Sequence, residues 1–257
     1  MKKYSERYNV VSFFSGCGGF DYGFHNKKFN LILATDEWED AVQSFKLNYK
    51  DVNVVKKDIR NFTDLELKNI IGNRKIDVVI GGPPCQCFTR LNNEQLIHQG
   101  KKNIEDKRRS LSSEYIKKIE YLNPEIVLME NVRDLLTRKN LKGELYREII
   151  QNEFKKIGYT SFYQIVKMND YGSCEKRTRV IFIASNDKKI IEILKNDKLN
   201  GFPEPSKKKL YVKDRLDKLS KFKNLENSER IEIKGETTIK RIKKSQKEVI
   251  IMIYQMI

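Results

Sequence analysis

The stretch VIGGPPCQCFT, from Val79 to Thr89, contains the side chain with the clearest potential for covalent chemistry. Cys85 follows two prolines at the end of an apolar run, and two glycines precede the prolines. Proline restricts the backbone, so the approach to this thiol is rigid. A cysteine attacks as a thiolate, which needs an electropositive and partly exposed setting. The position therefore favours a nucleophile, and a buried packing cysteine is the alternative for Cys85 taken alone.

The charged residues that accompany this thiol favour recognition of a planar heterocycle. Glu130 ends a predicted strand, and with Arg177 or Arg179 nearby its carboxyl group would bind and protonate such a ring. The alternatives are a helix cap for Glu130 and a solvent-facing position for the arginines. A cysteine protease is disfavoured, because neither His25 nor His98 is an obvious base for the thiol.

A glycine-rich turn, FSGCGGF from Phe14 to Phe20, allows a sharp bend and a close approach of the backbone to a ligand. Asp36 ends the next predicted strand, where an acid in dinucleotide-binding folds accepts both ribose hydroxyls. Glu37 or Trp38 would then lie beside an adenine, and Asp58 would accept its amino group. The alternatives are a tight connection for the turn and helix caps for the two aspartates. Together, the turn and the acids predict an adenosine-containing cofactor.

A framework of alternating strands and helices must position these residues. Apolar runs predict strands at 10–14, 31–34, 52–55, 77–80 and 126–129, and a late strand pair at 161–168 and 180–184. Helical spacing predicts helices at 113–122 and 145–157, and one after the second strand with Ala41, Val42, Phe45 and Tyr49 on one face. This alternation is typical of a mostly parallel α/β sheet, whose ligands bind beyond the carboxyl ends of the strands. The glycine turn, Asp36, Asp58, Cys85 and Glu130 all follow predicted strands and therefore converge on one edge.

The balance of charges indicates a polyanionic partner. Among 257 residues, 51 are Lys or Arg and 35 are Asp or Glu, which gives a formal net charge of +16. Nucleic acid is the simplest such partner, and compositional drift is the alternative. The four cysteines have no metal-binding spacing, so no metal site is expected. Because no signal-peptide or membrane-spanning run is found, we expect a cytoplasmic chain with reduced thiols and no membrane contact.

The order of the motifs resembles that of the C5-cytosine DNA methyltransferases. The similarity covers about residues 9–216 and rests on FSGCGGF, GGPPCQ at 81–86, DKRRSL at 106–111, ENV at 130–132 and RTR at 177–179. GFPEP at 201–205 and VKD at 212–214 are similar to the exit from the family's catalytic core. Each string alone is weakly specific, whereas several of them in order at suitable spacing are highly specific.

This resemblance implies a Rossmann-like fold that binds S-adenosylmethionine and methylates C5 of cytosine in double-stranded DNA, within a bacterial restriction-modification system. It implies that Cys85 attacks C6 of a flipped cytosine and that Glu130 holds N3 and the amino group. Arg179 would contact the base and Arg177 would support the site. The loop that follows Cys85 would close on the base, with three polar candidates for filling the vacated space: Gln95, His98 and Gln99.

The same resemblance implies a cofactor pocket. Its residues would come from the glycine turn, from the ends of the second and third strands, from the segment before the cysteine and from the DKRRSL string. They are Phe14, Gly16, Cys17, Gly18, Gly19, Asp36, Glu37, Trp38, Asp58, Ile59, Pro84 and Leu111.

The chain departs from the family pattern at three places. Cys87 stands where a small residue is usual, and Cys174-Glu175-Lys176 stands where Pro-Gln is usual, so that Glu175 adds a negative charge near the arginines. The target-recognition region and the last two motifs are not found. We therefore expect a catalytic domain at 1–200, and a linker with the start of a truncated or atypical recognition region at 201–257. A complementing C-terminal subunit or a truncated fragment explains this better than a lysine-rich tail that replaces the missing part.

Three other functions are open. The family's tRNA-methylating branch carries a string similar to PPCQCFTR at 83–90, which would place the same chemistry on RNA. A catalytically incomplete nucleic-acid-binding subunit would keep the basic surface without the activity. A nicotinamide oxidoreductase is the least favoured, because it leaves Cys85 and Glu130 unexplained.

Overall fold

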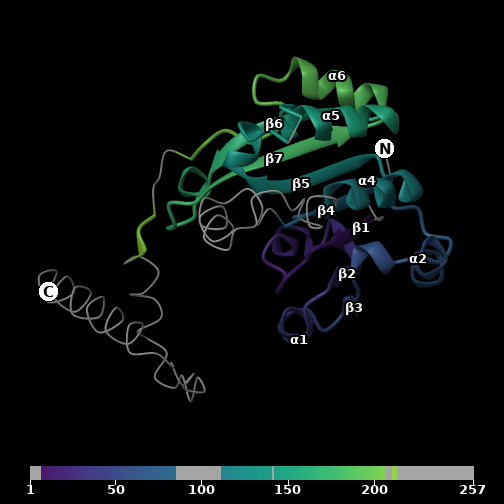
Figure 1. Cartoon of the computed structure of the whole chain (residues 1–257). Helices are drawn as coiled ribbons and strands as arrows, with labels where there is room; N and C mark the ends of the chain where they lie inside the picture. The colour runs from purple at the N-terminus through teal and green to yellow at the C-terminus, as the bar shows by residue number, and fades with distance from the viewer. Residues whose placement is uncertain (1–6, 85–110, 141, 207–209, 213–257) are drawn as a thin grey trace, which may run out of the picture. The chain divides into compact units, whose positions relative to one another are not determined.

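The computed structural model describes residues 7–84, 111–140, 142–206 and 210–212 (Figure 1). Cys85 and the loop that follows it lie outside the described residues. Within them, seven strands form one sheet in the order β3-β2-β1-β4-β5-β7-β6. The strands are β1 Tyr8–Phe13, β2 Phe29–Asp36, β3 Asn53–Lys56, β4 Val78–Gly81, β5 Ile126–Val132, β6 Thr160–Lys167 and β7 Thr178–Ser185.

The pairing of the strands confirms the predicted α/β fold. Strands β1 to β5 are parallel to one another, whereas β7 is antiparallel to both β5 and β6. The late strand pair expected from the sequence is therefore β6 with β7. Because β1 to β5 are parallel, their carboxyl ends lie at the same edge of the sheet, which is where open α/β sheets bind ligands.

Within the described residues, five α-helices and four short 3₁₀-helices accompany these strands. They are α1 Glu39–Asn48, α2 Asp64–Ile71, α4 Leu111–Leu122, α5 Tyr146–Lys156 and α6 Lys188–Asn196, with η1 Asp21–Phe24 and η2 Ile59–Asn61 among the 3₁₀ segments. The sequence analysis did not predict α2 or α6, which are short. A signal for α2 was present, because Thr63 and Glu66 form a capping box in which each side chain accepts the other's backbone N–H.

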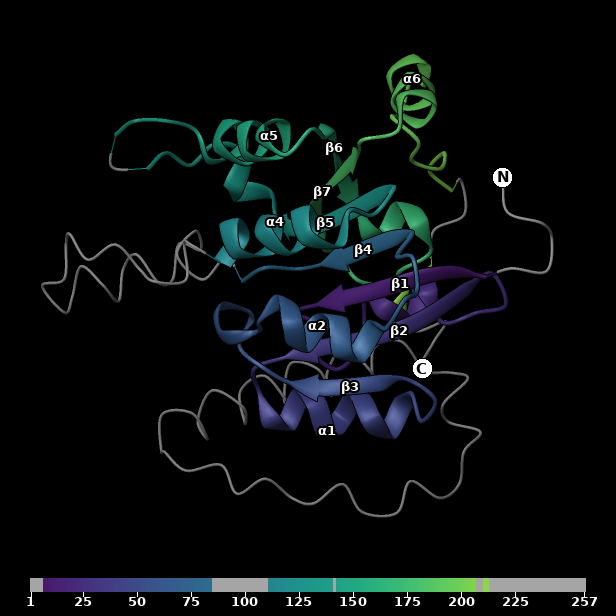
Figure 2. The same ribbon diagram turned by 90° about the vertical axis from the view of Figure 1, so that its right-hand side faces the viewer.

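Apolar side chains form a core on each face of the sheet. In the first cluster, Val11 and Phe13 of β1 pack with Tyr115 of α4, and α2 and α5 also contribute. In the second, Val10 of β1 packs with Phe45 of α1. Successive residues of β1 thus serve opposite faces, as a strand requires. Figure 2 shows α2 and α4 lying across one face of the sheet.

The glycine turn after β1 is held by close packing against α1. The hydroxyl of Tyr49 donates a 2.8 Å hydrogen bond to the carbonyl oxygen of Gly18. A Cβ atom on Gly18 would collide with the ring of Tyr49, and the φ angle of Gly18 is +92°. Both the left-handed backbone and the ring contact therefore require glycine at this position.

A buried carboxyl group follows this turn directly. The side chain of Asp21 is fully buried at the start of η1, and neither of its oxygens has a hydrogen-bond partner among the described residues. Burial raises the pKa of Asp21 to about 6, although the nearby Ser12 hydroxyl opposes that rise. The folded chain therefore holds this proton more tightly than the unfolded chain does.

We predict that Gly18→Ala lowers the free energy of unfolding by about 2–4 kcal/mol, because alanine must adopt a positive φ and displace Tyr49. Gly23→Ala is the matched control, since a Cβ on Gly23 meets no atom within 4 Å. Urea denaturation of the two variants checks the prediction. Equal losses of stability would show that the contact with Tyr49 does not constrain the turn.

We also predict a pH-dependent effect of Asp21→Asn. Because the pKa of Asp21 is raised on folding, its contribution to stability is complete below about pH 4 and is lost as the pH rises through about 6. The variant should therefore gain stability over the wild type with rising pH, by about 3 kcal/mol at pH 7.5. Urea denaturation at several pH values measures this gain. A difference in stability between the two proteins that does not change with pH would contradict the assignment of this buried carboxyl group.

Candidate functional site

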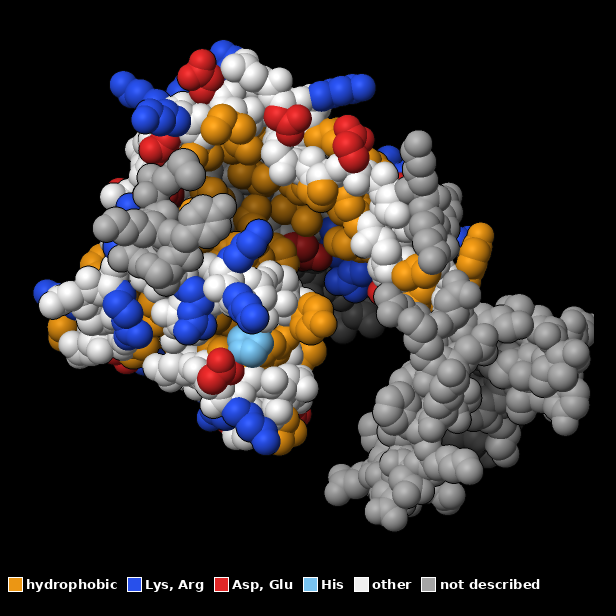
Figure 3. Space-filling model, turned by 180° about the vertical axis from the view of Figure 1, so that it is seen from behind, with side chains coloured by type: hydrophobic (Ala, Val, Ile, Leu, Met, Phe, Trp, Pro, Cys, Tyr) orange, Lys and Arg blue, Asp and Glu red, His pale blue; other side chains and the backbone are white. Residues whose placement is uncertain are grey.

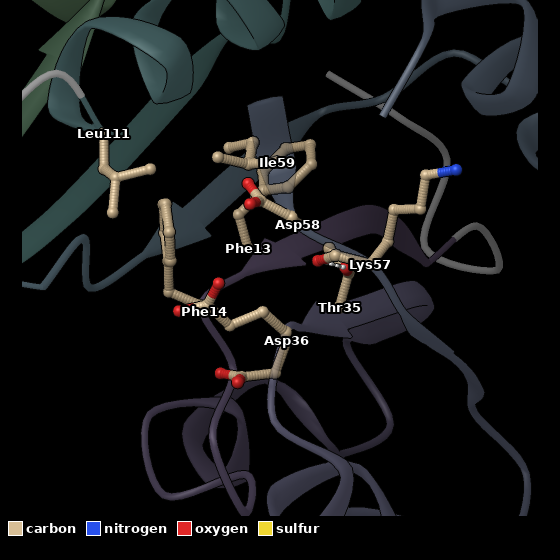
Figure 4. A pocket seen from close by; sticks show the side chains of 9 residues that line it. Phe13, Phe14, Thr35, Asp36, Lys57, Asp58, Ile59 and Leu111 are labelled. Atoms are coloured by element: carbon tan, nitrogen blue, oxygen red, sulfur yellow. Dashed lines mark hydrogen bonds between the residues drawn. The ribbon is translucent and has the colours of Figure 1, made fainter. Parts of the chain in front are cut away.

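A pocket opens at the carboxyl edge of the sheet, where β1, β2 and β3 end (Figure 4). Its walls combine apolar side chains with three carboxylates. The lining residues are Phe13, Phe14, Thr35, Asp36, Glu37, Lys57, Asp58, Ile59 and Leu111. Six residues of the cofactor pocket expected from the sequence are among them, and Phe13, Thr35 and Lys57 were missed although each is adjacent in sequence to an expected residue.

Asp36 links the segment that follows β1 to the segment that follows β2. One carboxylate oxygen accepts a 2.9 Å hydrogen bond from the backbone N–H of Gly16, and the other accepts a 3.0 Å bond from that of Trp38. Asp36 was expected to bind ribose hydroxyls, but both of its carboxylate oxygens already accept hydrogen bonds from the backbone. The neighbouring Glu37 is exposed, lines the same pocket and accepts no hydrogen bond from any described residue.

Asp58 acts as a helix cap, which was the alternative considered for it. Its side chain accepts the backbone N–H of Arg60 at 2.9 Å and also binds the Arg60 guanidinium group. The hydrogen bonds from the Arg60 side chain lower the pKa of Asp58, so the carboxylate stays ionised at neutral pH. The Arg60 guanidinium also donates to the second oxygen of Asp58, so a donor from a ligand would share this carboxylate with Arg60.

Two aromatic side chains next to this pocket are placed unusually. Phe14 lines the pocket with a φ angle of +54°, a conformation that costs a non-glycine residue about 1–2 kcal/mol. Trp38 precedes α1 with 66% of its surface exposed. Strained backbone and exposed aromatic rings are uncommon in a merely structural corner, and both are consistent with a ligand site.

The chemistry of the pocket restricts its ligand. Phe13, Phe14, Ile59 and Leu111 offer surface for a flat apolar group, whereas the three carboxylates suit hydroxyl, amino or cationic groups. The lining cation, Lys57, forms a 2.7 Å ion pair with Glu66. Three carboxylates beside a paired lysine would repel a phosphate group. The lining of the pocket therefore disfavours a ligand with phosphate groups, such as a dinucleotide.

A second charged cluster lies where β5 and β7 pair. Glu130 and Arg179 form an ion pair in which Nε of Arg179 lies 2.8 Å from one carboxylate oxygen, and the Arg177 guanidinium lies 3.7 Å from the same oxygen. The Glu130 side chain keeps about a quarter of its surface exposed, at 26%. The structure therefore brings together the three residues predicted to recognise a heterocycle, with both arginines at one oxygen of a partly exposed carboxylate.

Asn131 connects this cluster to the segment that leads to Cys85. The side chain of Asn131 is buried, and its amide donates a 3.2 Å hydrogen bond to the carbonyl oxygen of Pro83. The Cβ position of Gly82 lies 3.5 Å from a carboxylate oxygen of Glu130. Cys85 itself is outside the described residues, but Gly82, three residues before it, lies beside the carboxylate, and Pro83 is held by Asn131.

Other residues singled out in the sequence lie apart from these contacts. His25 pairs with Asp51 at 2.9 Å. Glu175 is exposed and forms no ion pair with a described arginine. Its negative charge was expected to affect Arg177 and Arg179, but its carboxylate pairs with neither guanidinium group. Among the described residues no group of His, Cys, Asp or Glu could hold a metal ion, and no helix is long and apolar enough to cross a membrane.

Comparisons with known proteins agree with this geometry. The family model for the C-5 cytosine-specific DNA methylase matches residues 8–256. Type II methyltransferase M.DdeI of Desulfomicrobium norvegicum is 33% identical over 175 residues, which make up 68% of this chain and 40% of the relative. Type II methyltransferase M.FnuDI of Fusobacterium nucleatum is 32% identical over 209 residues, 80% of this chain and 54% of the relative.

Solved structures show the same fold. A prophage-encoded protein from E. coli, described as a DNA modification methyltransferase, superposes with a TM-score of 0.64 at 27% identity over 81% of this chain and 54% of its own. The methyltransferase EhMeth of Entamoeba histolytica gives a TM-score of 0.56 at 22% identity over 80% of this chain and 58% of its own, which supports the fold alone. The chain thus spans about half the length of the relatives named here. By its sequence and its fold, it belongs to the C-5 cytosine-specific DNA methylase family.

Proposed function

We propose that this chain is the catalytic part of a DNA (cytosine-5-)-methyltransferase of a restriction-modification system, with double-stranded DNA as substrate and S-adenosylmethionine as cofactor. The observation that carries the proposal is the pairing of two sites. A carboxylate-lined pocket that disfavours phosphate lies at the same sheet edge as the Glu130–Arg179 pair, and Pro83 and Pro84 lead from β4 toward Cys85.

The described pocket residues suit S-adenosylmethionine, which supplies a methyl group carried on a positively charged sulfur. Glu37 is the better candidate for the ribose hydroxyls, since the Asp36 oxygens hold Gly16 and Trp38. The exposed Trp38 ring would cover the adenine, and Asp58 would accept its amino group. Phe14, Ile59 and Leu111 supply apolar contacts. Gly16, Cys17, Gly18, Gly19 and Pro84 would complete the pocket.

Glu130 would recognise the cytosine through N3 and the exocyclic amino group. The ion pair with Arg179 positions one carboxylate oxygen, and the other oxygen would bind the base. Arg179 would contact the base and Arg177 would support the site. A carboxyl group that binds N3 stabilises the ring as it accepts electrons from the nucleophile.

Cys85 would be the nucleophile. Its sulfur bonds to C6 and pushes an electron pair toward C5, the atom that becomes methylated. Loss of the C5 proton then restores the ring's double bond and breaks the bond between sulfur and C6. C6 is inaccessible in a stacked duplex, so the base must flip out. The loop residues Gln95, His98 and Gln99, which lie outside the described residues, are proposed to fill the space that it leaves.

The division of the chain also remains a proposal. We infer a catalytic domain at 1–200 and, at 201–257, a linker with the beginning of a recognition region. The curated relatives are about twice as long as the part that this chain matches. We therefore propose that full activity on DNA requires a complementing polypeptide that corresponds to the remainder of those relatives.

Cofactor binding can be followed through Trp38, the single tryptophan of the chain. S-adenosylmethionine should change its fluorescence emission. Glu37→Gln should weaken binding about tenfold without loss of stability, because this carboxylate has no partner in the described fold. Asp36→Asn should instead lower the free energy of unfolding by about 1–2 kcal/mol, because its amide N–H₂ would face a backbone N–H. The reverse pattern would assign the ribose to Asp36.

Methyl transfer tests the chemistry. With labelled S-adenosylmethionine, label should appear in unmethylated duplex DNA as 5-methylcytosine, either from this chain alone or after addition of the complementing polypeptide. Cys85→Ser should abolish the label and keep the Trp38 signal, because only the nucleophile is lost. Cys174→Ser is the matched control and should retain both.

Three results would contradict this assignment. Label that survives Cys85→Ser would remove the covalent mechanism. Label that appears in tRNA and not in DNA would favour the RNA-methylating alternative suggested by the PPCQCFTR string. Cofactor binding without transfer to either substrate, with the complementing polypeptide present, would favour a nucleic-acid-binding subunit without activity.

A further inference from the structure

A second pocket opens at the edge of the sheet opposite the candidate cofactor pocket, where β1, β2 and β3 begin. Its lining comes from the first residues of β2 and from the segments just before β1, β2 and β3. Its volume is about 270 Å³, just below the range of about 300–1,000 Å³ that is typical of small-molecule sites. The proposed methyl transfer makes no use of this pocket.

Positive charge dominates the lining of this second pocket. Arg7 and Lys27 are both exposed, and Asp51 is the one carboxylate among the lining residues. Within the described part of the chain Lys27 forms no ion pair, and the exposed Lys28 and Lys50 adjoin the lining in sequence. Figure 3 shows Lys and Arg side chains gathered around the histidine on this face. This arrangement attracts an anion, in contrast to the carboxylates of the cofactor pocket.

The carboxylate of Asp51 is paired within the pocket. Nε2 of His25 lies 2.9 and 3.2 Å from its two oxygens. This hydrogen bond lowers the pKa of Asp51, and the charge of Arg7 adds to the effect. The His25 ring also packs against the ring of Tyr49, with 5.0 Å between the ring centroids. These contacts hold the imidazole in place, and its Nδ1 atom, which has no hydrogen-bond partner among the described residues, remains for a ligand.

An apolar wall accompanies these charges in the lining. Leu31 is buried, and Phe29 and Val52 are half-buried. The ring of Phe29 is held by that of Phe24 in an edge-to-face arrangement, with 5.0 Å between the ring centroids. A bare phosphate ion makes no use of apolar surface, whereas a ligand that carries a flat ring beside its anionic group contacts both kinds of lining. The combination therefore favours a ligand with a ring and a phosphate group.

We propose that this second pocket binds a 5′-nucleotide. Arg7, Lys27 and His25 would hold the phosphate, to which Arg and Lys donate charge-assisted hydrogen bonds. The ring of the nucleotide would lie against Phe29 and Val52, since every base has a flat face that packs on aromatic and apolar side chains. The source of the nucleotide is either a free mononucleotide or the phosphorylated end of a nucleic-acid chain.

This site is separate from the candidate cofactor pocket. The two pockets have no lining residue in common. Phe29 begins β2 and Asp36 ends it, which places the pockets about 20 Å apart along this strand. A nucleotide in the second pocket and a cofactor in the first can therefore bind together.

Isothermal titration calorimetry of the full chain with thymidine 5′-monophosphate tests the proposal. Thymine avoids the sites proposed for adenine and for cytosine. Lys27→Glu and, as a second variant, Arg7→Gln each remove a positive charge from the pocket. Lys189→Glu is the matched control, because Lys189 is exposed on α6 and does not line the pocket. Circular dichroism checks that the variants fold.

The wild-type chain and Lys189→Glu should bind thymidine 5′-monophosphate with similar affinity. Each pocket variant should bind it about tenfold more weakly, because a charge-assisted hydrogen bond to the phosphate is lost. Inorganic phosphate should bind more weakly than the nucleotide, because it lacks the ring. No binding by the wild type, equal affinities in all variants, or inorganic phosphate that binds as tightly as the nucleotide would overturn the proposal. Displacement of the nucleotide by excess S-adenosylmethionine would also overturn it, because the nucleotide would then occupy the cofactor pocket.

A short DNA duplex with 5′-phosphate ends distinguishes the two sources of the nucleotide. If both pocket variants bind this duplex more weakly than Lys189→Glu does, the phosphate belongs to a nucleic-acid end. If all three bind the duplex equally and the loss is confined to thymidine 5′-monophosphate, the ligand is a free nucleotide. Either result supports the site and assigns its ligand.

Discussion

The Asp36 carboxylate is the interaction on which the candidate cofactor pocket depends. Through its two hydrogen bonds it ties the glycine turn after β1 to the start of α1 after β2. Neither connection has regular secondary structure of its own at this point, so this side chain, together with the hydrogen bond from Tyr49 to Gly18, sets their mutual position. Phe14, Glu37 and Trp38, which flank the two connections, are placed as a consequence. A charged acceptor for two backbone N–H groups is stronger than a neutral one, which suits a role that must resist the strain at Phe14.

The two candidate sites at the carboxyl edge of the sheet differ in charge and therefore favour different ligands. At β1 to β3, carboxylates dominate, and the one lining lysine is paired with Glu66. At β5 and β7, two arginines surround a single carboxylate. The first arrangement tolerates a cation and repels phosphate, whereas the second attracts a polyanion and still offers an acceptor to a base. A nucleic acid and a positively charged cofactor can therefore approach the same edge without competing for one site.

Much of this organisation was readable from sequence, because apolar runs report strands and parallel strands end at one edge. The convergence of the glycine turn, Asp58 and Glu130 followed from that rule alone. The role of Asp36 could not be predicted in this way. Its carboxylate binds the backbone N–H of Gly16, and the sequence does not show that the glycine turn after β1 lies within reach of a residue at the end of β2. Helices α2 and α6 were missed because they are short, although a capping box marked the first.

The two candidate sites stand on different strands of one sheet. The pocket lies where β1, β2 and β3 end, and α1 covers one face of these strands, whereas Glu130 and Arg179 lie on β5 and β7. The proposed binding of a cofactor and the proposed recognition of a base are therefore separable by substitution, because different strands carry the side chains of each.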